Sequence, residues 1–278
     1  MDQAVVETLE INLLVDAIFQ YVGRDYRYHR QDFLRQKLFS FMKVNSIATI
    51  SGLQEKIFHE SDIINSLLCC IDSRPVKLFD QPEKIMHFRR LMVPWLRSFP
   101  AANFWIADCI APEDIFGWII LLMEENLYCK TQLYVTSPNI HFLAAAKSGQ
   151  WPSELFEQYE HNYRLAGGSR SLSYYCSRIK DTFVFNPELG NNVYWSQYPL
   201  IGGASFNEYE VIVCCGGLSH LNARGRDRAL SLFYNSQPAF GLLAVQKASA
   251  LTEPIESFYK IISNEAGIYQ RKHRTIEP

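Results

Sequence analysis

The sequence predicts an α/β protein in which an all-helical N-terminal domain precedes a mainly parallel sheet with a small antiparallel β insertion. Three observations carry this prediction. Apolar residues recur at three- and four-residue spacing through residues 1–75, which is typical of amphipathic helices. Beyond residue 100, short apolar runs alternate with helical segments, which is typical of βαβ units. Residues 160–198 are instead rich in Tyr, Ser, Gly and Asn, which indicates turns and short antiparallel strands.

The N-terminal part is expected to contain four helices. They cover residues 6–22, residues 30–42, a stretch that opens at residues 51–54, and residues 61–70. Gly23 follows the first helix, where a glycine commonly ends one, and Ser61 is expected to be the N-cap of the fourth. Because these residues carry almost no strand pattern, we expect a helical domain over residues 1–75 and a linker helix over residues 76–100.

The remaining chain, residues 101–278, is expected to form the α/β domain. Its apolar runs, each expected to be a strand, are residues 103–107, 132–135, 210–214 and 241–245. The helical segments that alternate with them are residues 113–125, 139–147 and 223–233. Such alternation indicates a mainly parallel sheet with both faces covered. The β insertion is expected at about residues 165–198.

The composition excludes several classes of protein. The 278 residues are 48% hydrophobic and 20% charged, so the chain can bury a sizeable core and is neither disordered nor fibrous. Lysine and arginine number 27, aspartate and glutamate 29, and the formal charge is -2. This near balance argues against a protein coated in positive charge for nucleic acid.

Membrane insertion, secretion and metal binding are not expected. The apolar run at residues 118–123 is far shorter than the roughly 18 residues that a membrane-spanning helix needs. The N-terminus has no basic segment followed by an apolar one, so no secretory signal is visible. The seven cysteines include no C-x-x-C pair, which argues against a disulfide framework and against a zinc site. We therefore expect a cytoplasmic protein.

Several strings, read in order, resemble the CheR family of chemotaxis-receptor methyltransferases. The string F-D-Q-P-E at residues 79–83 is similar to F-R-D-P-E of the family, and W-I-A-D-C-I-A-P-E-D at residues 105–114 is similar to W-S-A-G-C-S-T-G-E-E. The ordered match extends from about residue 8 to residue 272. The resemblance implies a Rossmann-like class I methyltransferase domain that uses S-adenosylmethionine (SAM) to methylate glutamates on receptor helices.

The family's SAM fingerprints are altered in this chain. Two family glycines of the first loop correspond to Asp108 and Pro112, so a charged side chain and a residue without an N–H stand where the backbone should approach the ligand. The ribose-binding carboxylate corresponds to Ser137, whose neutral hydroxyl makes a weaker contact. The acidic pair after the loop is kept as Glu113 and Asp114, although acids in a first helical turn also simply complement the helix dipole, the explanation that we favour.

Other family positions have changed as well. A threonine and a functional arginine of the family correspond to Val76 and Asp80, and an asparagine corresponds to Pro199. The family string C-R-N-V-L-I-Y-F becomes C-C-G-G-L-S-H-L at residues 214–221, which removes its Arg, Asn and Tyr. The degenerate positions of the SAM site are therefore Val76, Asp80, Asp108, Pro112, Asp114, Ser137, Pro199, Cys215 and Gly216.

No catalytic residue is expected in this altered site. His220 stands at the position of the family tyrosine and could titrate near neutral pH. A lone histidine without a carboxylate to orient it is more often structural. Asp80 reverses the charge of the arginine that it replaces.

Two features are candidates for retained function. A basic face on the N-terminal domain of the family docks acidic receptor helices, and a similar cluster here comprises Arg24, Arg27, Arg30, Arg35 and Lys37. An ordinary solvated helix face explains the same pattern equally well. The second candidate is the β insertion with Tyr174 and Tyr175, because some relatives bind a receptor tail there by strand addition.

Three functions remain open at this point. The first is a non-catalytic CheR-like protein that needs no cofactor and binds an acidic helical partner, such as a chemoreceptor or another signalling protein. The second is an active SAM-dependent protein-glutamate methyltransferase. The third is a protein whose altered pocket binds a different small ligand. The family resemblance does not choose among them, because function is determined by the site and not by the fold.

Overall fold

The computed structural model describes residues 3–205, 207–214, 216, 218–245 and 256–273. The chain divides into two compact units. Unit 1 comprises Met1–Ser73 and His220–Arg228, and unit 2 comprises Arg74–Ser219 and Ala229–Pro278. Unit 1 is therefore built from two segments that are far apart in the sequence.

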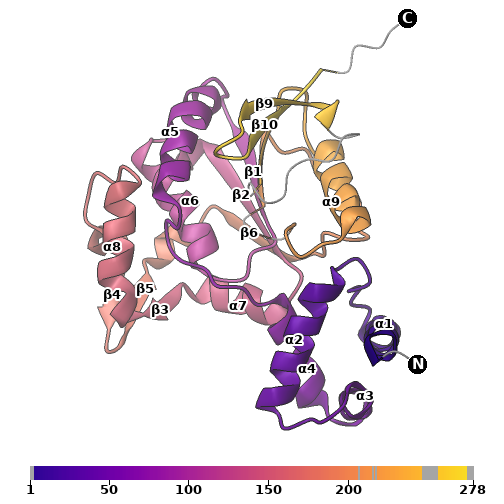
Figure 1. Cartoon of the computed structure of the whole chain (residues 1–278). Coiled ribbons are helices and arrows are strands. Elements are labelled where there is room, and N and C mark those ends of the chain that lie inside the picture. The colour runs from indigo at the N-terminus through magenta and orange to yellow at the C-terminus, as the bar shows by residue number, and fades with distance from the viewer. Residues whose placement is uncertain (1–2, 206, 215, 217, 246–255, 274–278) are drawn as a thin grey trace, which may run out of the picture. The chain divides into compact units, whose positions relative to one another are not determined.

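The described part of unit 1 contains four helices before residue 74, shown in indigo and purple in Figure 1. They are α1 (Gln3–Val22), α2 (Gln31–Val44), α3 (Ile50–His59) and α4 (Ser61–Asp72). Leu14, Leu38, Leu53 and Leu67 are fully buried where these helices meet. The expected cap at Ser61 is wrong: this serine is the first residue of α4, and Glu60 precedes the helix without a side-chain cap bond.

Unit 2 begins with residues 74–81, which form neither helix nor strand, and continues with helix α5 (Pro82–Arg97). Pro82 stands in the first turn of α5, where its missing N–H costs nothing. Phe79 and Gln81 both have left-handed φ angles, 51° and 63°, so the chain turns sharply immediately before the helix. Asp80, which we predict to be an altered family position, lies between these two residues.

A seven-stranded sheet lies at the centre of unit 2 among the described residues. Its strands are β1 (Ala102–Ala107), β2 (Thr131–Ser137), β6 (Val193–Gln197), β7 (Val211–Cys214), β8 (Leu242–Val245), β9 (Tyr259–Ser263) and β10 (Ile268–Arg271). The order is β6-β2-β1-β7-β8-β10-β9, with the first five strands parallel and β10 antiparallel to both of its neighbours. This is the predicted Rossmann-like fold, and its strand order reverses between β1 and β7.

Both faces of this sheet are covered. The helices that follow its strands are α6 (Glu113–Glu124), α7 (Ile140–Ser148) and α9 (Ala223–Asn235). Figure 1 shows α5 and α6 side by side over one face, where Phe104 and Ile106 of β1 join the main core. On the other face, the Trp105 ring packs against Phe233 of α9 with 5.4 Å between ring centroids. The Trp105 indole N–H donates to Oγ1 of Thr136 at 2.8 Å, which links β1 to β2.

The insertion differs from its predicted limits. A second sheet contains β3 (Gln150–Pro152), β4 (Cys176–Ile179) and β5 (Thr182–Phe185) in the order β3-β5-β4, all antiparallel, together with helix α8 (Phe156–Leu165). Short 3-10 helices complete the unit at η1 (Tyr128–Lys130), η2 (Ser153–Leu155), η3 (Leu172–Tyr174) and η4 (Pro187–Gly190). The insertion thus begins before residue 165, and it ends earlier because residues 193–197 pair in parallel with β2 instead.

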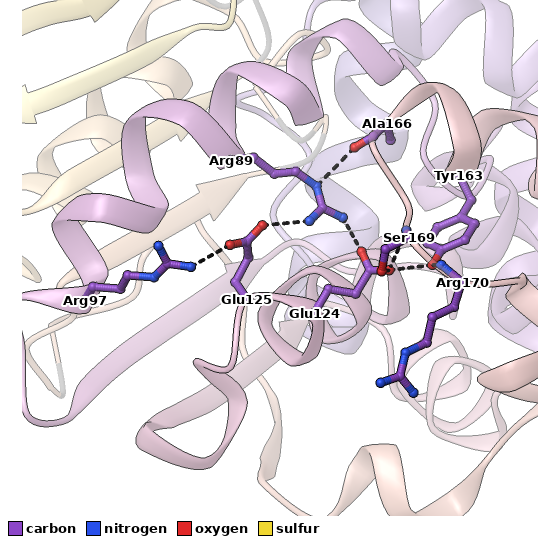
Figure 2. A network of polar contacts seen from close by, with 8 residues as sticks. All are labelled: Arg89, Arg97, Glu124, Glu125, Tyr163, Ala166, Ser169 and Arg170. Atoms are coloured by element: carbon purple, nitrogen blue, oxygen red, sulfur yellow. Dashed lines mark hydrogen bonds and ion pairs between the residues drawn. The ribbon is translucent and has the colours of Figure 1, made fainter.

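A polar network fixes the insertion to the helices of unit 2 (Figure 2). Arg89 of α5 forms ion pairs with Glu124 and Glu125 at the end of α6, and its Nε donates to the carbonyl of Ala166 at 3.0 Å. Glu124 also accepts the hydroxyl of Tyr163 from α8. Because the side chain of Glu124 is only 3% exposed, its charge depends on these partners.

Neither a spanning helix nor a metal cluster occurs in the described part of the chain. None of its helices has both the length and the apolar content needed to cross a bilayer. No group of three or more His, Cys, Asp or Glu side chains there is placed to hold a metal ion.

Candidate functional site

The candidate site lies at the carboxyl end of β1, where the order of the parallel strands reverses. In open α/β sheets, ligands bind in the crevice at this point. Residues 108–112 form the loop that connects β1 to α6. The N–H of Cys109 donates to the carbonyl of Thr136 at 2.8 Å, which ties this loop to β2.

Asp108 begins the loop with a φ of 59°. This left-handed conformation normally favours glycine, and aspartate is one of the few other residues that adopt it. The bend of a glycine loop is therefore retained, but a side chain now projects from it. Pro112 follows as the N-cap of α6 with a φ of -57°, and its carbonyl accepts the N–H of Ile115 at 3.0 Å.

Asp114, in the first turn of α6, is almost completely buried by its own loop. Its Oδ2 accepts the N–H of Ile110 at 3.0 Å and a guanidinium N–H of Arg74 at 2.7 Å. Burial raises the pKa of Asp114, while the Arg74 charge and the Ile110 amide act in the opposite direction. The helix dipole alone therefore does not account for this acid, because specific donors from the loop and from residue 74 hold it.

Arg74 contacts this loop and was not among the site residues predicted from the sequence. Besides Asp114, its guanidinium donates to the carbonyl of Asp108 at 3.3 Å, so one side chain contacts both the first residue of the loop and the first turn of α6. A Cβ added to Gly216 would lie 3.0 Å from Nε of Arg74. The arginine thus occupies space that a side chain at position 216 would need. One feature of the sequence could have indicated Arg74. The string at residues 74–80 has Asp80 where we place the family arginine, and it begins with an arginine at position 74 instead.

A cavity of about 120 Å³ lies beside this loop. Its lining includes Val76, Asp80, Glu113, Asp114, Trp118 and Cys214. Sites for small molecules commonly enclose about 300–1,000 Å³, so this cavity is small for a ligand the size of SAM. Three of the predicted positions, Val76, Asp80 and Asp114, do meet in it.

The acids of the cavity differ in their surroundings. Asp80 is exposed at the rim, in the turn where its backbone N–H donates to the carbonyl of Lys77 at 3.2 Å. Glu113 accepts the hydroxyl of Tyr159 at 2.8 Å. Burial raises the pKa of Glu113 above its ordinary value. A carboxyl with these properties more easily stays protonated than an exposed one.

Ser137, at the end of β2, is directed into its own turn. The residue is fully buried, and its hydroxyl donates to the carbonyl of Asn139 at 3.2 Å while accepting the Asn139 N–H at 3.3 Å. The Asn139 side chain in turn accepts the N–H of His141 and caps α7. The hydroxyl of Ser137, which we predict to stand where the family has a carboxylate, is thus part of the strand-to-helix turn.

Pro199 and Cys215 are the two predicted SAM positions that have not yet been described. Pro199 is exposed in the segment that follows β6. Cys215 lies outside the described residues.

A comparison with known proteins decides the family. No protein-family model matches the chain. The chain is 31% identical over 237 residues to a Pseudomonas putida protein named "Putative methyltransferase Cher3", and the alignment covers 85% of this chain and 87% of that protein. The chain belongs to the CheR family of methyltransferases. The resemblance found in the sequence strings is confirmed.

Two solved structures are similar to this CheR-family chain. The N-methyltransferase NodS of Bradyrhizobium japonicum is 12% identical, with 70% of this chain and 100% of NodS covered and a TM-score of 0.37. YjhP of Escherichia coli is 13% identical, with 69% of this chain and 70% of YjhP covered and a TM-score of 0.38.

His220, at the family tyrosine, lies in unit 1 within a stack of rings. Its imidazole stacks on that of His29, with centroids 4.6 Å apart and planes inclined by 23°, and also on Phe33 at 5.1 Å. The carbonyl of His220 accepts the N–H of Arg30 at 2.9 Å. Burial, followed by the charges of His220 and Arg24, lowers the pKa of His29 to about 3. These contacts are those of packing residues.

The five basic residues predicted to bind a partner all have polar partners within unit 1. Their contacts are Arg24 with Asp72, Arg27 with Asp25 and Asp16, Arg30 with Asp32, Arg35 with Glu7, and Lys37 with the carbonyls of Cys70 and Ser73. Arg27, Arg30 and Arg35 are exposed, whereas Arg24 and Lys37 are half-buried. Burial lowers the pKa of Lys37. The cluster therefore carries much less net charge than its arginines alone suggest.

Proposed function

We propose that this CheR-family protein has lost SAM binding and methyl transfer and acts by contact with a protein partner. The observation that carries the proposal is the contact of Arg74 with Asp114 and with the Asp108 carbonyl. SAM carries a sulfonium and an ammonium group, which together outweigh its single carboxylate, so an acidic site would attract it. Here an internal guanidinium, that of Arg74, already pairs with the buried acid in the first turn of α6.

The rest of the site supports the same conclusion. The Ser137 hydroxyl forms both of its hydrogen bonds with Asn139, and it lacks the charge of the carboxylate that grips ribose in related sites. A side chain extends from the left-handed bend at Asp108, where close approach of a ligand favours glycine. The cavity of about 120 Å³ is smaller than common small-molecule sites.

Calorimetric titration of the full chain with SAM, and separately with its demethylated product, tests this proposal. We expect no heat of binding up to millimolar ligand. An active CheR-family enzyme in the same buffer is the positive control. Micromolar binding would contradict the loss of the SAM site. Transfer of labelled methyl groups from SAM to a receptor fragment would show that the chain is an active protein-glutamate methyltransferase.

The cavity itself favours a second candidate function, in which the altered pocket binds a ligand smaller than SAM. It combines carboxyl groups at Asp80 and Glu113 with the apolar ring of Trp118. A thermal-shift screen of small polar metabolites tests this candidate. Stabilisation that is lost in Trp118→Ala would support it, and a screen without any shift would count against it.

The partner that we propose is an acidic helical protein, such as a chemoreceptor or another signalling protein. The exposed guanidinium groups of Arg27, Arg30 and Arg35 support this choice, although the partner must compete with Asp25, Asp32 and Glu7 for them. Reversal of these three arginines to glutamate should abolish capture of the partner. Unchanged capture would remove this surface from consideration.

A further inference from the structure

Strand β6 is an edge of the large sheet, with β2 as its single neighbour among the described strands. The carbonyl of Asn192, immediately before β6, accepts the N–H of Leu133 in β2 at 3.0 Å. Because successive residues of a strand direct their backbone groups to opposite sides, every second residue after Asn192 faces away from β2. These outward residues are Val193, Trp195 and Gln197. Within the described part of the chain, no backbone group outside β2 pairs with them.

The other sheet edges carry residues that hinder pairing, whereas β6 does not. Lys260 is exposed on β9, Arg178 is exposed on β4, and Pro152 belongs to β3. A charged side chain or a proline on an edge strand is the usual protection against the addition of a further strand. The sequence of β6 is V-Y-W-S-Q, with neither a charge nor a proline. This edge is therefore open to another strand.

The absence of charge around β6 favours a second copy of this chain as the partner. Residues 189–207 contain no lysine, arginine, aspartate or glutamate, and Glu188 and Glu208 are the nearest charged residues in the sequence. In a two-fold contact each surface meets itself, so a charge near the axis meets a like charge and is repelled. An uncharged edge avoids this repulsion, and it offers nothing that would select a charged partner.

Side chains next to β6 can add the area that a stable contact needs. Tyr194 is 60% exposed, and its ring stacks on that of Tyr134 in β2 with 5.4 Å between centroids. Helix α7 packs against both β2 and β6 and exposes Ile140 and Ala144. A pair of five-residue strands buries little surface by itself, whereas a specific interface buries about 1,200 Å² or more. The aromatic and apolar side chains beside the edge can supply the difference.

We propose that two copies of this chain pair through β6, antiparallel about a two-fold axis at Trp195, so that the two large sheets become one. In this register the backbone groups of Trp195 bond to those of Trp195 in the second copy, and Val193 lies opposite Gln197. The two Tyr194 side chains take diagonal positions on one face, within reach of each other. The inference is independent of SAM binding, and it concerns the large sheet rather than the β insertion.

Sedimentation equilibrium of the full chain, from low to high micromolar concentration, tests the proposal. We expect a reversible dimer, and we expect Tyr194→Lys to raise its dissociation constant at least about tenfold, because two lysines then face each other across the axis. Tyr174→Lys is the matched control, since Tyr174 is 56% exposed and lies outside the large sheet. An equimolar mixture of Tyr194→Lys and Tyr194→Glu should dimerise again, because the two charges are opposite.

Hydrogen exchange locates the contact. We expect the amides of residues 193–197 to exchange more slowly at high than at low protein concentration, and to lose this dependence in Tyr194→Lys. Circular dichroism verifies that each variant folds.

Several results would overturn the proposal: an unmodified chain that stays monomeric, a dimer that Tyr194→Lys leaves intact, or equal dissociation by Tyr174→Lys. A monomer that binds a synthetic peptide of the β6 sequence would also overturn it, since the edge would then accept a segment of another protein. SAM calorimetry on the same preparations gives a separate result, because SAM binding would refute the lost cofactor site and leave the dimer unaffected.

Discussion

A guanidinium N–H of Arg74 donates to the carboxylate of Asp114 at 2.7 Å, and the two side chains are only 20% and 3% exposed. This ion pair closes the loop at the carboxyl end of β1, where related folds bind their ligands. The Arg74 guanidinium and the Asp114 carboxylate are thus paired with each other inside unit 2.

Arg74→Ala should destabilise unit 2, because it leaves the Asp114 carboxylate buried with only the Ile110 amide as a partner. Removal of one partner from a buried ion pair typically costs about 3 kcal/mol or more. Urea denaturation measures the free energy of unfolding. Arg164→Ala is the matched control, since it breaks an exposed helical ion pair with Glu160 and should cost less than about 1 kcal/mol. Equal costs would contradict the role given to Arg74.

Gly216→Asn restores the family residue and should be destabilising for two reasons. The φ of Gly216 is 148°, which side chains rarely adopt, and the added Cβ would lie 3.0 Å from Nε of Arg74. Arg74→Asn relieves only the second problem. A double-mutant cycle on unfolding free energies should therefore show coupling between positions 74 and 216. Strict additivity would mean that Arg74 does not fill the space at Gly216.

Unit 1 should lose stability as the pH falls. The pKa of His29 is lowered in the folded protein to about 3, from an ordinary value of 6.5. Below pH 6.5 the unfolded chain therefore binds a proton that folded His29 does not, so the stabilisation is complete above that pH and is lost as the pH falls towards 3. Chemical denaturation followed at pH 7, 5.5 and 4 measures this loss.

The comparison that isolates this effect is His29→Phe, which keeps a ring beside His220 and cannot be protonated. Carboxyl groups also titrate over this pH range. The result is therefore the difference in lost unfolding free energy between the unmodified chain and His29→Phe. We expect the unmodified chain to lose more stability than His29→Phe on acidification. Parallel curves would exclude His29 as the source.

Tyr163→Phe should loosen the attachment of the insertion. Its hydroxyl donates to the buried Glu124 and accepts the N–H of Arg170 at 3.0 Å, as Figure 2 shows. Loss of this group removes a hydrogen bond to the buried carboxylate of Glu124, which keeps Arg89 and Ser169 as partners, and a hydrogen bond to a charged group contributes about 1.5–3 kcal/mol. Limited proteolysis of residues 166–175 should become faster. Tyr174→Phe is the control, since Tyr174 is 56% exposed, and equally fast cleavage of both variants would contradict the anchoring role.

Much of the fold could be predicted because it depends on local pattern. The helical spacing of residues 6–22 and the apolar runs near β1 and β2 reflect interactions within a few residues or burial of a whole face. The insertion was placed wrongly for a different reason. The local pattern of residues 193–197 predicts a strand but does not indicate which sheet the strand joins. Only the pairing with β2 assigns these residues to the large sheet.

The sequence by itself determined the family, the Rossmann-like architecture and the positions where the SAM fingerprints are altered, because these follow from residue order and hydrophobic period. Only the tertiary structure decided what the residues at these positions contact. Arg74 meets Asp114 across 40 residues, and His29 meets His220 from a different segment of unit 1. Such contacts depend on how distant segments pack, and no local propensity encodes the partner of a charged side chain.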